Sequence, residues 1–315
     1  MRVMPNMRDT SAPAIGSVIL NWNSGAFAAE AARSVLQAGG PSRSVLIVDN
    51  GSIDNSADFL EAKLPECEIL RAGRNLGFAE GCNEGIRLFL SRGAEFVLLL
   101  NADAWIAPDA LERLLDAMAA PAPGAARIAA AGARVLFAGA PDRIESVGAW
   151  LSPSTGRIYH RGHGKTGLDM PGILFPDAVS GCAMLLRAEA LRDVGGFDPA
   201  LFCYFEDVDW CLRARERGWG VATAAQARVW HWGSASSGGR ISPARLYYST
   251  RNQLRVWETR FPLERRAALW ARRGAILALW TAFALASSGM PTSAALREIR
   301  SGWRDFLAGR YGERR

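Results

Sequence analysis

Short apolar runs alternate with helix-like segments through the first 120 residues, and this rhythm constrains the fold more than any other feature. The apolar runs that we predict to be strands are 15–20, 45–48, 68–70 and 96–100. The segments with helical spacing are 27–37, 54–63, 79–91 and 108–119. Strands that alternate with helices build parallel sheets with helices on both faces. We therefore expect an α/β fold with a mixed, mostly parallel sheet flanked by helices.

The later part of the chain predicts a less regular arrangement followed by a helical end. Residues 121–176 are rich in Gly, Pro and Ala and predict loops and short strands. Further strands are expected at 178–186 and 220–224, and a helix at 206–217. We divide the chain into a disordered tail (1–13), an α/β domain (14–242) and a helical, arginine-rich C-terminal segment (243–315).

Composition limits the class of protein. Hydrophobic residues make up 49% of the chain, which is enough for a sizeable core and argues against global disorder. The five cysteines form no C-x-x-C pair, so we expect buried reduced thiols in a cytoplasmic protein rather than disulfides or a zinc site. The polar residues 1–13 contain no apolar stretch typical of a signal peptide.

Positive charge gathers at the C-terminal end. From Arg245 onward 14 arginines stand against five acids, a balance of +9, so the preceding residues sum to −3 within the total of +6. This asymmetry predicts a basic surface for a polyanion or an anionic membrane. No nucleic-acid-binding motif accompanies the charge, so we expect no nucleic acid partner.

An apolar run lies inside this basic segment. Residues 274–286 are shorter than the roughly 20 residues that span a bilayer. We expect an amphipathic helix that lies on the membrane surface, with nearby arginines that contact anionic headgroups. Those arginines are Arg265, Arg266, Arg272 and Arg273. The alternatives are a helical subdomain packed on the core and a contact between two copies in a homodimer.

Polar residues end two of the predicted strands. Asp49 closes the second strand, and Asn101-Ala102-Asp103 follows the fourth. Carboxylates at the ends of buried strands are costly unless they bind something, and ligands of open α/β sheets bind at this edge. Asp49 suits a nucleobase N–H, although the Asn50-Gly51 pair after it is also ordinary turn chemistry. Asn101 and Asp103 offer oxygen ligands to a hard divalent cation or, alternatively, cap the next helix.

The segment 71–83 combines glycines and amide side chains just before a predicted helix. Glycine turns and helix N-termini suit phosphate groups, because their backbone N–H groups are free to donate. The segment contains neither the Gly-Lys-Ser/Thr of a Walker motif nor the G-x-G-x-x-G of a dinucleotide site.

Three acids, Glu206, Asp207 and Asp209, fall in the first turn of a predicted helix. Acids at this position are favoured by the helix dipole, by about 0.3–1 kcal/mol each, which is a purely structural explanation. The aromatic residues around them favour a partly desolvated sugar site instead, where a carboxylate acts as general base. These aromatic residues are Phe202, Tyr204, Phe205 and Trp210.

His231 lies between two tryptophans, Trp230 and Trp232. A lone histidine in an apolar stretch is more often structural than a ligand. The interpretation as a metal ligand is favoured if a second ligand lies close to His231 in the fold, and Asp103 is the candidate. His160 and His163 are assigned no role.

Together these motifs resemble glycosyltransferase family 2, in its rhamnosyltransferase-like and galactofuranosyltransferase-like branch. The similarity covers roughly residues 15–255, and the combination of motifs in order is more specific than any one of them. The matching stretches are 18–23, 48–52, 74–78, 100–103, 180–183, 195–198, 205–213 and 230–231.

The resemblance implies a GT-A fold over residues 14–242 and an inverting reaction. Asp103 and His231 would hold Mn²⁺ or Mg²⁺ on the donor diphosphate. Asp207 would be the base that activates the acceptor hydroxyl, with Glu206 as the alternative. The expected donor-binding residues are Asn21, Asn23, Asp49, Arg74, Asn75, Gly77, Phe78, Asn83, Asn101, Ala102 and Asp103. The residues expected at the acceptor or in support are Gly181, Asp209, Trp210 and Arg213.

The resemblance also implies a role for Arg213 and a consequence of Asn101. Arg213 is expected to orient the acids Glu206 and Asp207 through a charge-assisted pair. Asn101 stands where the family's motif has Asp, and a neutral ligand there is expected to weaken metal affinity, although related branch members often carry Asn at this position.

The resemblance also implies a substrate class. We expect a nucleoside-diphosphate sugar as donor, with dTDP-rhamnose first and UDP-galactofuranose or another UDP- or GDP-sugar next. The acceptor would be a glycan or polyprenyl-linked glycan precursor of the cell envelope or an exopolysaccharide, at the inner face of the cytoplasmic membrane. The alternatives are a non-catalytic scaffold with the same fold and a nucleotidyltransferase. The latter would need an early Gly-rich loop with Arg or Lys, and Asn21–Gly25 is not one.

Overall fold

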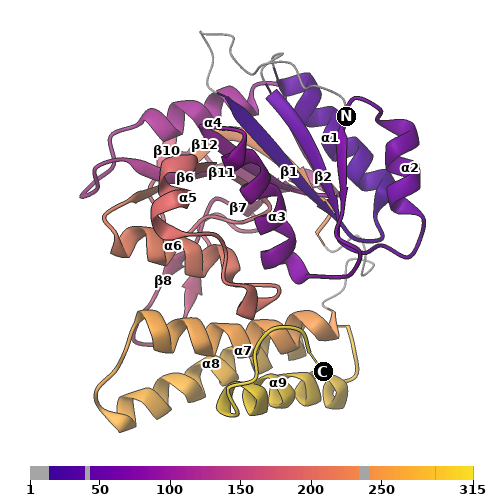
Figure 1. Cartoon of the computed structure of the whole chain (residues 1–315). Helices are drawn as coiled ribbons and strands as arrows, with labels where there is room; N and C mark the ends of the chain where they lie inside the picture. The colour runs from indigo at the N-terminus through magenta and orange to yellow at the C-terminus, as the bar shows by residue number, and fades with distance from the viewer. Residues whose placement is uncertain (1–13, 40–42, 234–241, 288, 315) are drawn as a thin grey trace.

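The computed structural model describes residues 14–39, 43–233, 242–287 and 289–314. The tail predicted at 1–13 lies outside the described residues. A central sheet with helices on both faces forms the upper body, and three C-terminal helices form a layer below it (Figure 1). The predicted mixed, mostly parallel α/β fold is confirmed.

Four parallel strands build the N-terminal half of the sheet. They are β1 (Ile15–Asn21), β2 (Arg43–Asp49), β3 (Glu68–Arg71) and β4 (Phe96–Asn101). The register places Asn21 opposite Asp49, and Leu20 opposite Asn101. The polar ends of three strands therefore lie side by side at one edge of the sheet.

The other half of the sheet contains strands that the sequence did not predict in full. β11 (Ala183–Arg187) runs antiparallel between β4 and β6 (Ile128–Phe137), and β12 (Gly220–His231) runs parallel to β6. The prediction of loops and short strands at 121–176 was wrong for β6. Its Ala- and Gly-rich sequence has weak strand propensity, but small residues fit a crowded sheet centre: a Cβ at Gly132 would lie 2.6 Å from the Val179 side chain.

The remaining short strands lie around β6 and β12. β5 (Ala104–Ile106) pairs with β12, β7 (Ala140–Ser146) pairs with β6, and β10 (Ile173–Leu174) pairs with β12. β8 (Trp150–Leu151) and β9 (Ile158–Tyr159) form a separate two-stranded sheet. The β5–β12 pairing matters most, because it brings His231 opposite Ala104, next to Asp103.

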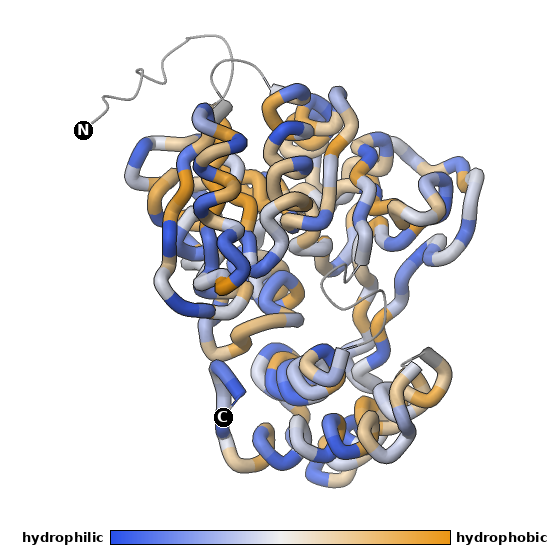
Figure 2. Tube along the Cα trace, turned by 90° about the vertical axis from the view of Figure 1, so that its right-hand side faces the viewer, coloured by the Kyte–Doolittle hydropathy of each residue, from blue (hydrophilic) through white to orange (hydrophobic). Residues whose placement is uncertain are grey.

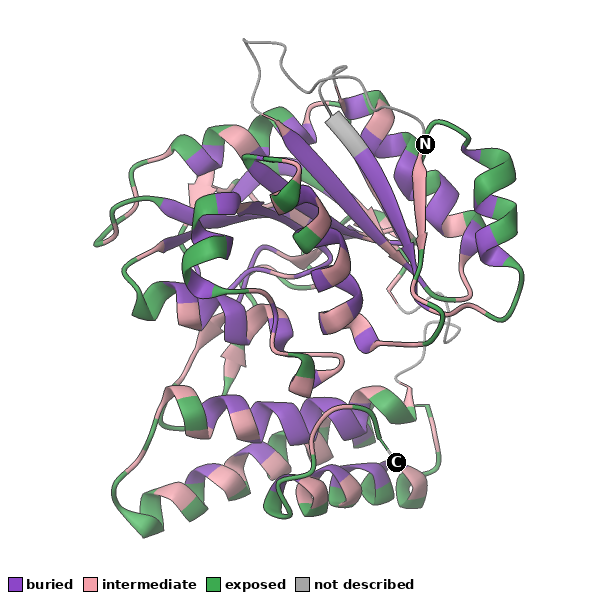
Figure 3. Cartoon of the chain, in the orientation of Figure 1, coloured by how far each residue is buried: buried purple, intermediate pink, exposed green. Residues whose placement is uncertain are grey.

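Helices cover both faces of the sheet, and the central strands between them are buried, whereas β3 at one edge is partly exposed (Figure 3). One face packs against α1 (Gly25–Ala38), α2 (Ser56–Lys63) and α4 (Ala110–Ala119). The other packs against α3 (Gly77–Ser91), α5 (Ala188–Val194) and α6 (Glu206–Glu216). α5 was not predicted.

The C-terminal segment is helical, as expected. It consists of α7 (Pro243–Arg260), α8 (Arg266–Ser287) and α9 (Thr292–Leu307). The three helices lie in a layer beneath the sheet domain, and hydrophobic and hydrophilic residues alternate along them (Figure 2). Leu254 and Trp257 of α7 share an apolar cluster with Leu201 and Phe205, which precede α6. No helix among the described residues is long and apolar enough to cross a membrane.

Two of the arginines expected beside the apolar run of α8 point inward. Arg272 is buried and donates to the backbone oxygens of Phe261 (2.6 Å) and Pro153 (3.0 Å). Arg273 pairs with Glu258 at 2.6 Å. The prediction that all four arginines contact headgroups is therefore wrong for Arg272 and Arg273, because each has internal acceptors. Arg265 and Arg266 are exposed.

Candidate active site

The ends of β1 and β2 form a polar network around Asp49. Asn21 is fully buried and donates through Nδ2 to Asp49 Oδ1 at 2.8 Å. The backbone N–H of Ser52 donates to Asp49 Oδ2 at 3.2 Å, and the Ser52 hydroxyl accepts from Asn23 N at 2.9 Å. The Asn23 side chain in turn accepts from Ile53 N at 2.8 Å. Asn21 and Asn23 thus fix the turn that carries Asp49.

Asn50 positions the loop that contains Arg74, Asn75 and Gly77. Its Oδ1 accepts from Leu76 N (2.9 Å), and its Nδ2 donates to Asn75 Oδ1 (3.1 Å) and Gly77 O (3.2 Å). Gly51 has φ +73°, and a Cβ there would lie 2.4 Å from the Arg74 carbonyl carbon, so the two turns touch through backbone. The sequence predicted only a turn at Asn50, because its hydrogen-bond partners lie about 25 residues away along the chain.

A second cluster forms where β4, β5 and β12 end. His231 Nε2 lies 3.2 Å from Asp103 Oδ1, and Asn101 Nδ2 lies 3.4 Å from the same ring nitrogen. Asn101 Oδ1 is buried and accepts no hydrogen bond from the described residues. The structure thus brings the three predicted residues together and leaves a buried oxygen facing no donor, which fits a site for a cation.

Glu145 on β7 completes this cluster and was missed from the sequence. Its Oε2 accepts from His231 Nδ1 at 2.9 Å. A carboxylate on the far nitrogen of a histidine fixes the ring and leaves Nε2 for a metal. Glu145 lies in the segment 121–176, which the sequence predicted to form loops and short strands, and no sequence motif pointed to it.

The charge state of His231 is set by its neighbours. Burial lowers the pKa of His231, but Cys182, Asp103 and Glu145 outweigh that effect and raise the pKa well above the ordinary value. A histidine must be neutral to bind a metal, so a cation at Nε2 competes with a proton.

The acids Glu206 and Asp207 open α6 in different surroundings. Glu206 is buried, and its Oε2 has no partner among the described residues. Asp207 is half-buried and accepts from Gly181 N (2.8 Å) and Val208 N (2.7 Å). A Cβ at Gly181 would lie 3.5 Å from Phe78 Cε1, so Phe78 belongs to this part of the site.

Burial raises the pKa of both acids, for Glu206 with a further contribution from the charge of Asp207. For Asp207 the backbone N–H groups of Gly181 and Val208 oppose the rise. Glu206 therefore favours its neutral form more strongly than Asp207 does.

Gly181 and Cys182 connect the two clusters. Gly181 N donates to Asp207, and Asn101 N donates to Cys182 O at 2.9 Å. The two adjacent residues thus link the acids of α6 to the Asn101–Asp103–His231 cluster at the same edge of the sheet.

Four predicted site residues have internal partners instead. Arg213 donates to Asp209 (2.8 Å) and to the carbonyls of Val194 (2.9 Å) and Gly196 (2.7 Å), so the expected pair with Glu206 or Asp207 is wrong. Asp209 also binds Arg260 at 2.9 Å, which ties α6 to α7. In this way Asp209 and Arg213 hold α6 in place.

The other two are Trp210 and Asn83. Trp210 is fully buried and donates to Gly195 O at 2.7 Å. Asn83 accepts from Phe197 N and donates to Phe197 O, each at 2.9 Å. The side chains of Trp210 and Asn83 therefore bind the backbone of residues 195–197.

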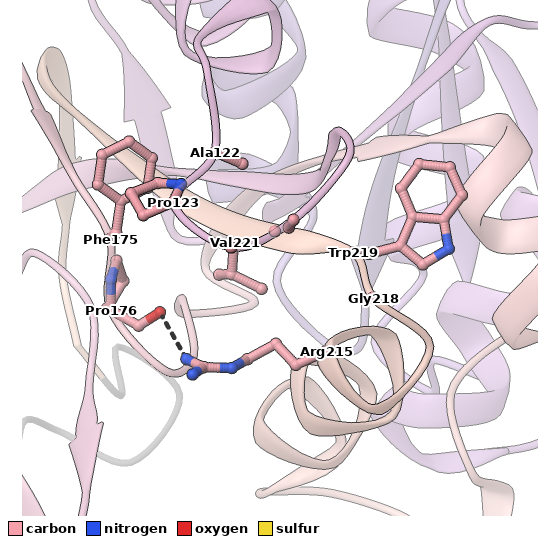
Figure 4. A pocket seen from close by; sticks show the side chains of 11 residues that line it. Ala122, Pro123, Phe175, Pro176, Arg215, Gly218, Trp219 and Val221 are labelled. Carbon is pink, nitrogen blue, oxygen red and sulfur yellow. Dashed lines mark hydrogen bonds between the residues drawn. The ribbon is translucent and has the colours of Figure 1, made fainter.

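A cavity of about 330 Å³ lies at the other end of the sheet. Ala122, Pro123, Phe175, Trp219 and Val221 line it, and Arg215 donates across it to Pro176 O at 3.3 Å (Figure 4). Ile128 and Gly220, where β6 and β12 begin, mark this end, whereas the site residues lie where the strands finish. The cavity is therefore separate from the candidate site.

Comparison with known proteins shows that the chain is a nucleotide-sugar glycosyltransferase and that its α/β fold is that of GT-A enzymes. The family described as "Glycosyltransferase like family 2" matches residues 13–255, and the chain belongs to this family. The chain is 28% identical over 216 residues to N-acetylglucosaminyl-diphospho-decaprenol L-rhamnosyltransferase of Mycobacterium tuberculosis. That match covers 62% of this chain and 68% of the relative.

Solved structures share the fold. The mannosyltransferase PcManGT of Pyrobaculum calidifontis, in complex with GDP-Man and Mn²⁺, has a TM-score of 0.59 at 14% identity, covering 97% of this chain and 89% of its own. GalNAc-T7 with UDP, GalNAc and Mn²⁺ has a TM-score of 0.60 at 13% identity, covering 95% of this chain and 57% of its own. Both are structures of glycosyltransferases with Mn²⁺.

Proposed function

We propose that this glycosyltransferase is inverting and metal-dependent, and that it transfers rhamnose from dTDP-rhamnose to a hydroxyl of a polyprenyl-linked glycan precursor. The observation that carries the proposal is the link through Gly181 and Cys182, which sets a candidate base beside a candidate metal site. The rhamnose and the lipid-linked acceptor are those in the name of the mycobacterial relative. UDP-galactofuranose and other UDP- or GDP-sugars are the next donors to test.

Asp103 and His231 would hold Mn²⁺ or Mg²⁺, with Asn101 Oδ1 as a neutral third ligand. The described residues contain no group of three or more His, Cys, Asp or Glu side chains arranged to hold a metal alone. Two strong protein ligands suit a cation that takes its other oxygens from a diphosphate. When bound, the ion would neutralise negative charge on the leaving nucleoside diphosphate.

Asp207 is the better candidate for the base. A base must be ionised before it accepts a proton, and two backbone N–H groups stabilise the Asp207 carboxylate. Glu206 is buried beside it, and only its own backbone N–H opposes the rise of its pKa, so the neutral acid is favoured. Asp207 would take the acceptor proton while Glu206 shapes the pocket.

We propose that Asp49, which Asn21 and Ser52 hold in place, accepts a hydrogen bond from a nucleobase N–H. Arg74, Asn75, Gly77 and Phe78 lie on the next turn, which the Asn50 side chain holds against the Asp49 turn. We propose that these two turns bind the nucleoside and diphosphate, and that residues 14–242 form the catalytic domain.

A non-catalytic scaffold is the second candidate. It would have no physical need to keep buried polar atoms without partners, and Asn101 Oδ1 and Glu206 Oε2 are two of these among the described residues. Such atoms cost free energy that a ligand or proton can offset, and they favour an active site.

Acidification is expected to reduce transfer at a pH above the ordinary range of an aspartate. The pKa of Asp207 is raised by burial, and the ionised form is required, so kcat/KM is full above that raised pKa and falls as the pH drops through it. Donor affinity measured at the same pH values separates this effect from protonation of His231. An acid limb at or below the pKa of an exposed aspartate would exclude Asp207 as the base.

We propose that α8 touches the membrane surface where the lipid-linked acceptor lies, at the inner face of the cytoplasmic membrane. Trp270, Leu279 and Leu285 are 54%, 42% and 58% exposed, and Arg265 and Arg266 stand exposed near the start of the helix. Exposed apolar side chains and exposed arginines on the same helix support this contact, because interfacial helices combine both kinds of residue.

Replacing Trp270, Leu279 and Leu285 together by Ser is expected to abolish co-sedimentation with phosphatidylglycerol vesicles. Point variants are preferable to deletion, because α7–α9 share a core with Leu201 and Phe205. The matched control is Phe59→Ser on α2, which removes an exposed aromatic residue elsewhere. Unchanged sedimentation of the triple variant would refute the membrane contact, and a dimer that dissociates in the variant would assign this face to self-association.

A further inference from the structure

The loop that leads into the catalytic helix has an unusual backbone. Phe202, Tyr204 and Phe205 have φ values of +62°, +67° and +74°, in the left-handed region that bulky residues rarely adopt. Glu206 and Asp207 follow directly, so the direction in which α6 begins depends on this loop. Such a conformation persists only where the surroundings hold it.

Asn252 on α7 holds the loop through its backbone oxygens. It is fully buried, and its Nδ2 lies within hydrogen-bonding distance of the carbonyls of Leu201 (2.8 Å), Cys203 (2.9 Å) and Tyr204 (2.8 Å). The two N–H groups of one amide thus serve three carbonyls of the loop, with one hydrogen shared between two of them.

Arg251 adds a second layer of contacts. It is 1% exposed and donates through Nη2 to Leu201 O (3.2 Å), and through Nε to Asn252 Oδ1 (2.9 Å), which fixes the orientation of the Asn252 amide. Its Nη1 donates to Gly312 O at 2.9 Å, while Gly312 N donates to Ala200 O at 2.7 Å. Gly312, near the C-terminus, therefore contacts both Arg251 and the residue just before the loop, Ala200.

The loop also touches the donor side of the site. Phe202 O accepts from Ala79 N at 3.1 Å, and a Cβ at Gly77 would lie 2.5 Å from that oxygen. The conformation held by α7 thus sets the base, on α6, relative to the start of α3.

We propose that Asn252 and Arg251 are positioning residues for sugar transfer. By binding the carbonyls of Leu201, Cys203 and Tyr204, they maintain the left-handed loop and aim Asp207 at the acceptor hydroxyl. The C-terminal segment is then part of the catalytic apparatus as well as a membrane contact. This inference rests on the proposed role of Asp207 as base.

The test compares Asn252→Leu with Gln253→Leu in the full chain. Gln253 is a matched control: it is the next residue of α7, equally buried, and its amide donates to Gly156 O (2.6 Å) and accepts from Trp280 Nε1 (2.7 Å), away from the loop. Both variants lose one buried amide and are expected to lower the thermal midpoint to a similar extent.

Asn252→Leu is expected to lower kcat about 100-fold with little change in donor affinity, because a small misplacement of a catalytic group costs rate rather than binding. Hydrogen exchange of residues 200–209 should accelerate in this variant and not in Gln253→Leu. Equal kcat in the two variants, or unchanged exchange of the loop, would overturn the proposal.

Two further measurements cover the cases in which Asn252→Leu does not fold or the proposed function fails. If Asn252→Leu does not fold, Arg251→Met takes away the donors to Leu201 O and to Asn252 Oδ1, and a folded Arg251→Met variant with unchanged kcat and unchanged exchange of the loop would also overturn the proposal. Failure of the proposed function is seen separately, as absence of transfer in the unmodified protein or its survival in Asp207→Asn. The exchange comparison between Asn252→Leu and Gln253→Leu does not depend on either result.

Discussion

Asp207→Asn is expected to lower kcat for sugar transfer by about 10³-fold, the middle of the range that general-base catalysis supplies. The amide keeps the size of the carboxylate and accepts from Gly181 N through its oxygen, but it cannot take a proton from the acceptor. Donor affinity should stay near that of the unmodified protein, because Asp207 is not among the candidate metal ligands. Initial rates and donor titrations on the same preparation measure both quantities.

Glu206→Gln is the informative companion to Asp207→Asn. If Glu206 is the neutral acid that its raised pKa favours, the amide resembles it closely and most of the activity remains. Loss of transfer in Glu206→Gln, together with its survival in Asp207→Asn, would reverse the assignment of the base.

His231→Ala is expected to weaken the apparent affinity for Mn²⁺ by more than about 100-fold, since changes to the partner of a metal-bound histidine alone cost about 10–100-fold in metal affinity. The variant removes the ring nitrogen that faces Asp103 and Asn101. A titration of activity against Mn²⁺ concentration at saturating donor measures the effect.

Glu145→Gln provides the graded control for His231→Ala. The amide leaves His231 in place but loses the charged partner at Nδ1, so metal affinity should fall within the 10–100-fold range. Identical Mn²⁺ dependence in His231→Ala and the unmodified protein would exclude His231 as a ligand.

The sequence predicted the strand-end residues because polarity changes abruptly there. Asp49 and Asn101 each follow an uninterrupted apolar run, and in parallel strands such residues meet at one edge. The pairing of Asp103 with His231 could not be predicted from the strand ends alone. It depends on β5 pairing with β12, and β12 extends seven residues beyond the strand end predicted at 224.

The missed features depend on contacts between distant parts of the chain. Glu145 reaches His231 across 86 residues, and Asn252 reaches the loop before α6 across about 50. Arg213 was assigned to the wrong acid because helical spacing permits several partners, whereas the structure selects Asp209 four residues earlier. The sequence around each of these residues does not show which of several possible partners it contacts in the fold.

The most direct test of the central claim is calorimetric titration of sugar nucleotides into the full chain. dTDP-rhamnose, UDP-galactofuranose and GDP-mannose would each be titrated with and without Mn²⁺, beside Asp103→Ala. The account predicts that one donor, first of all dTDP-rhamnose, binds only with Mn²⁺ and that Asp103→Ala loses this binding. Absence of binding by every donor, or binding that is indifferent to both Mn²⁺ and Asp103, would contradict it.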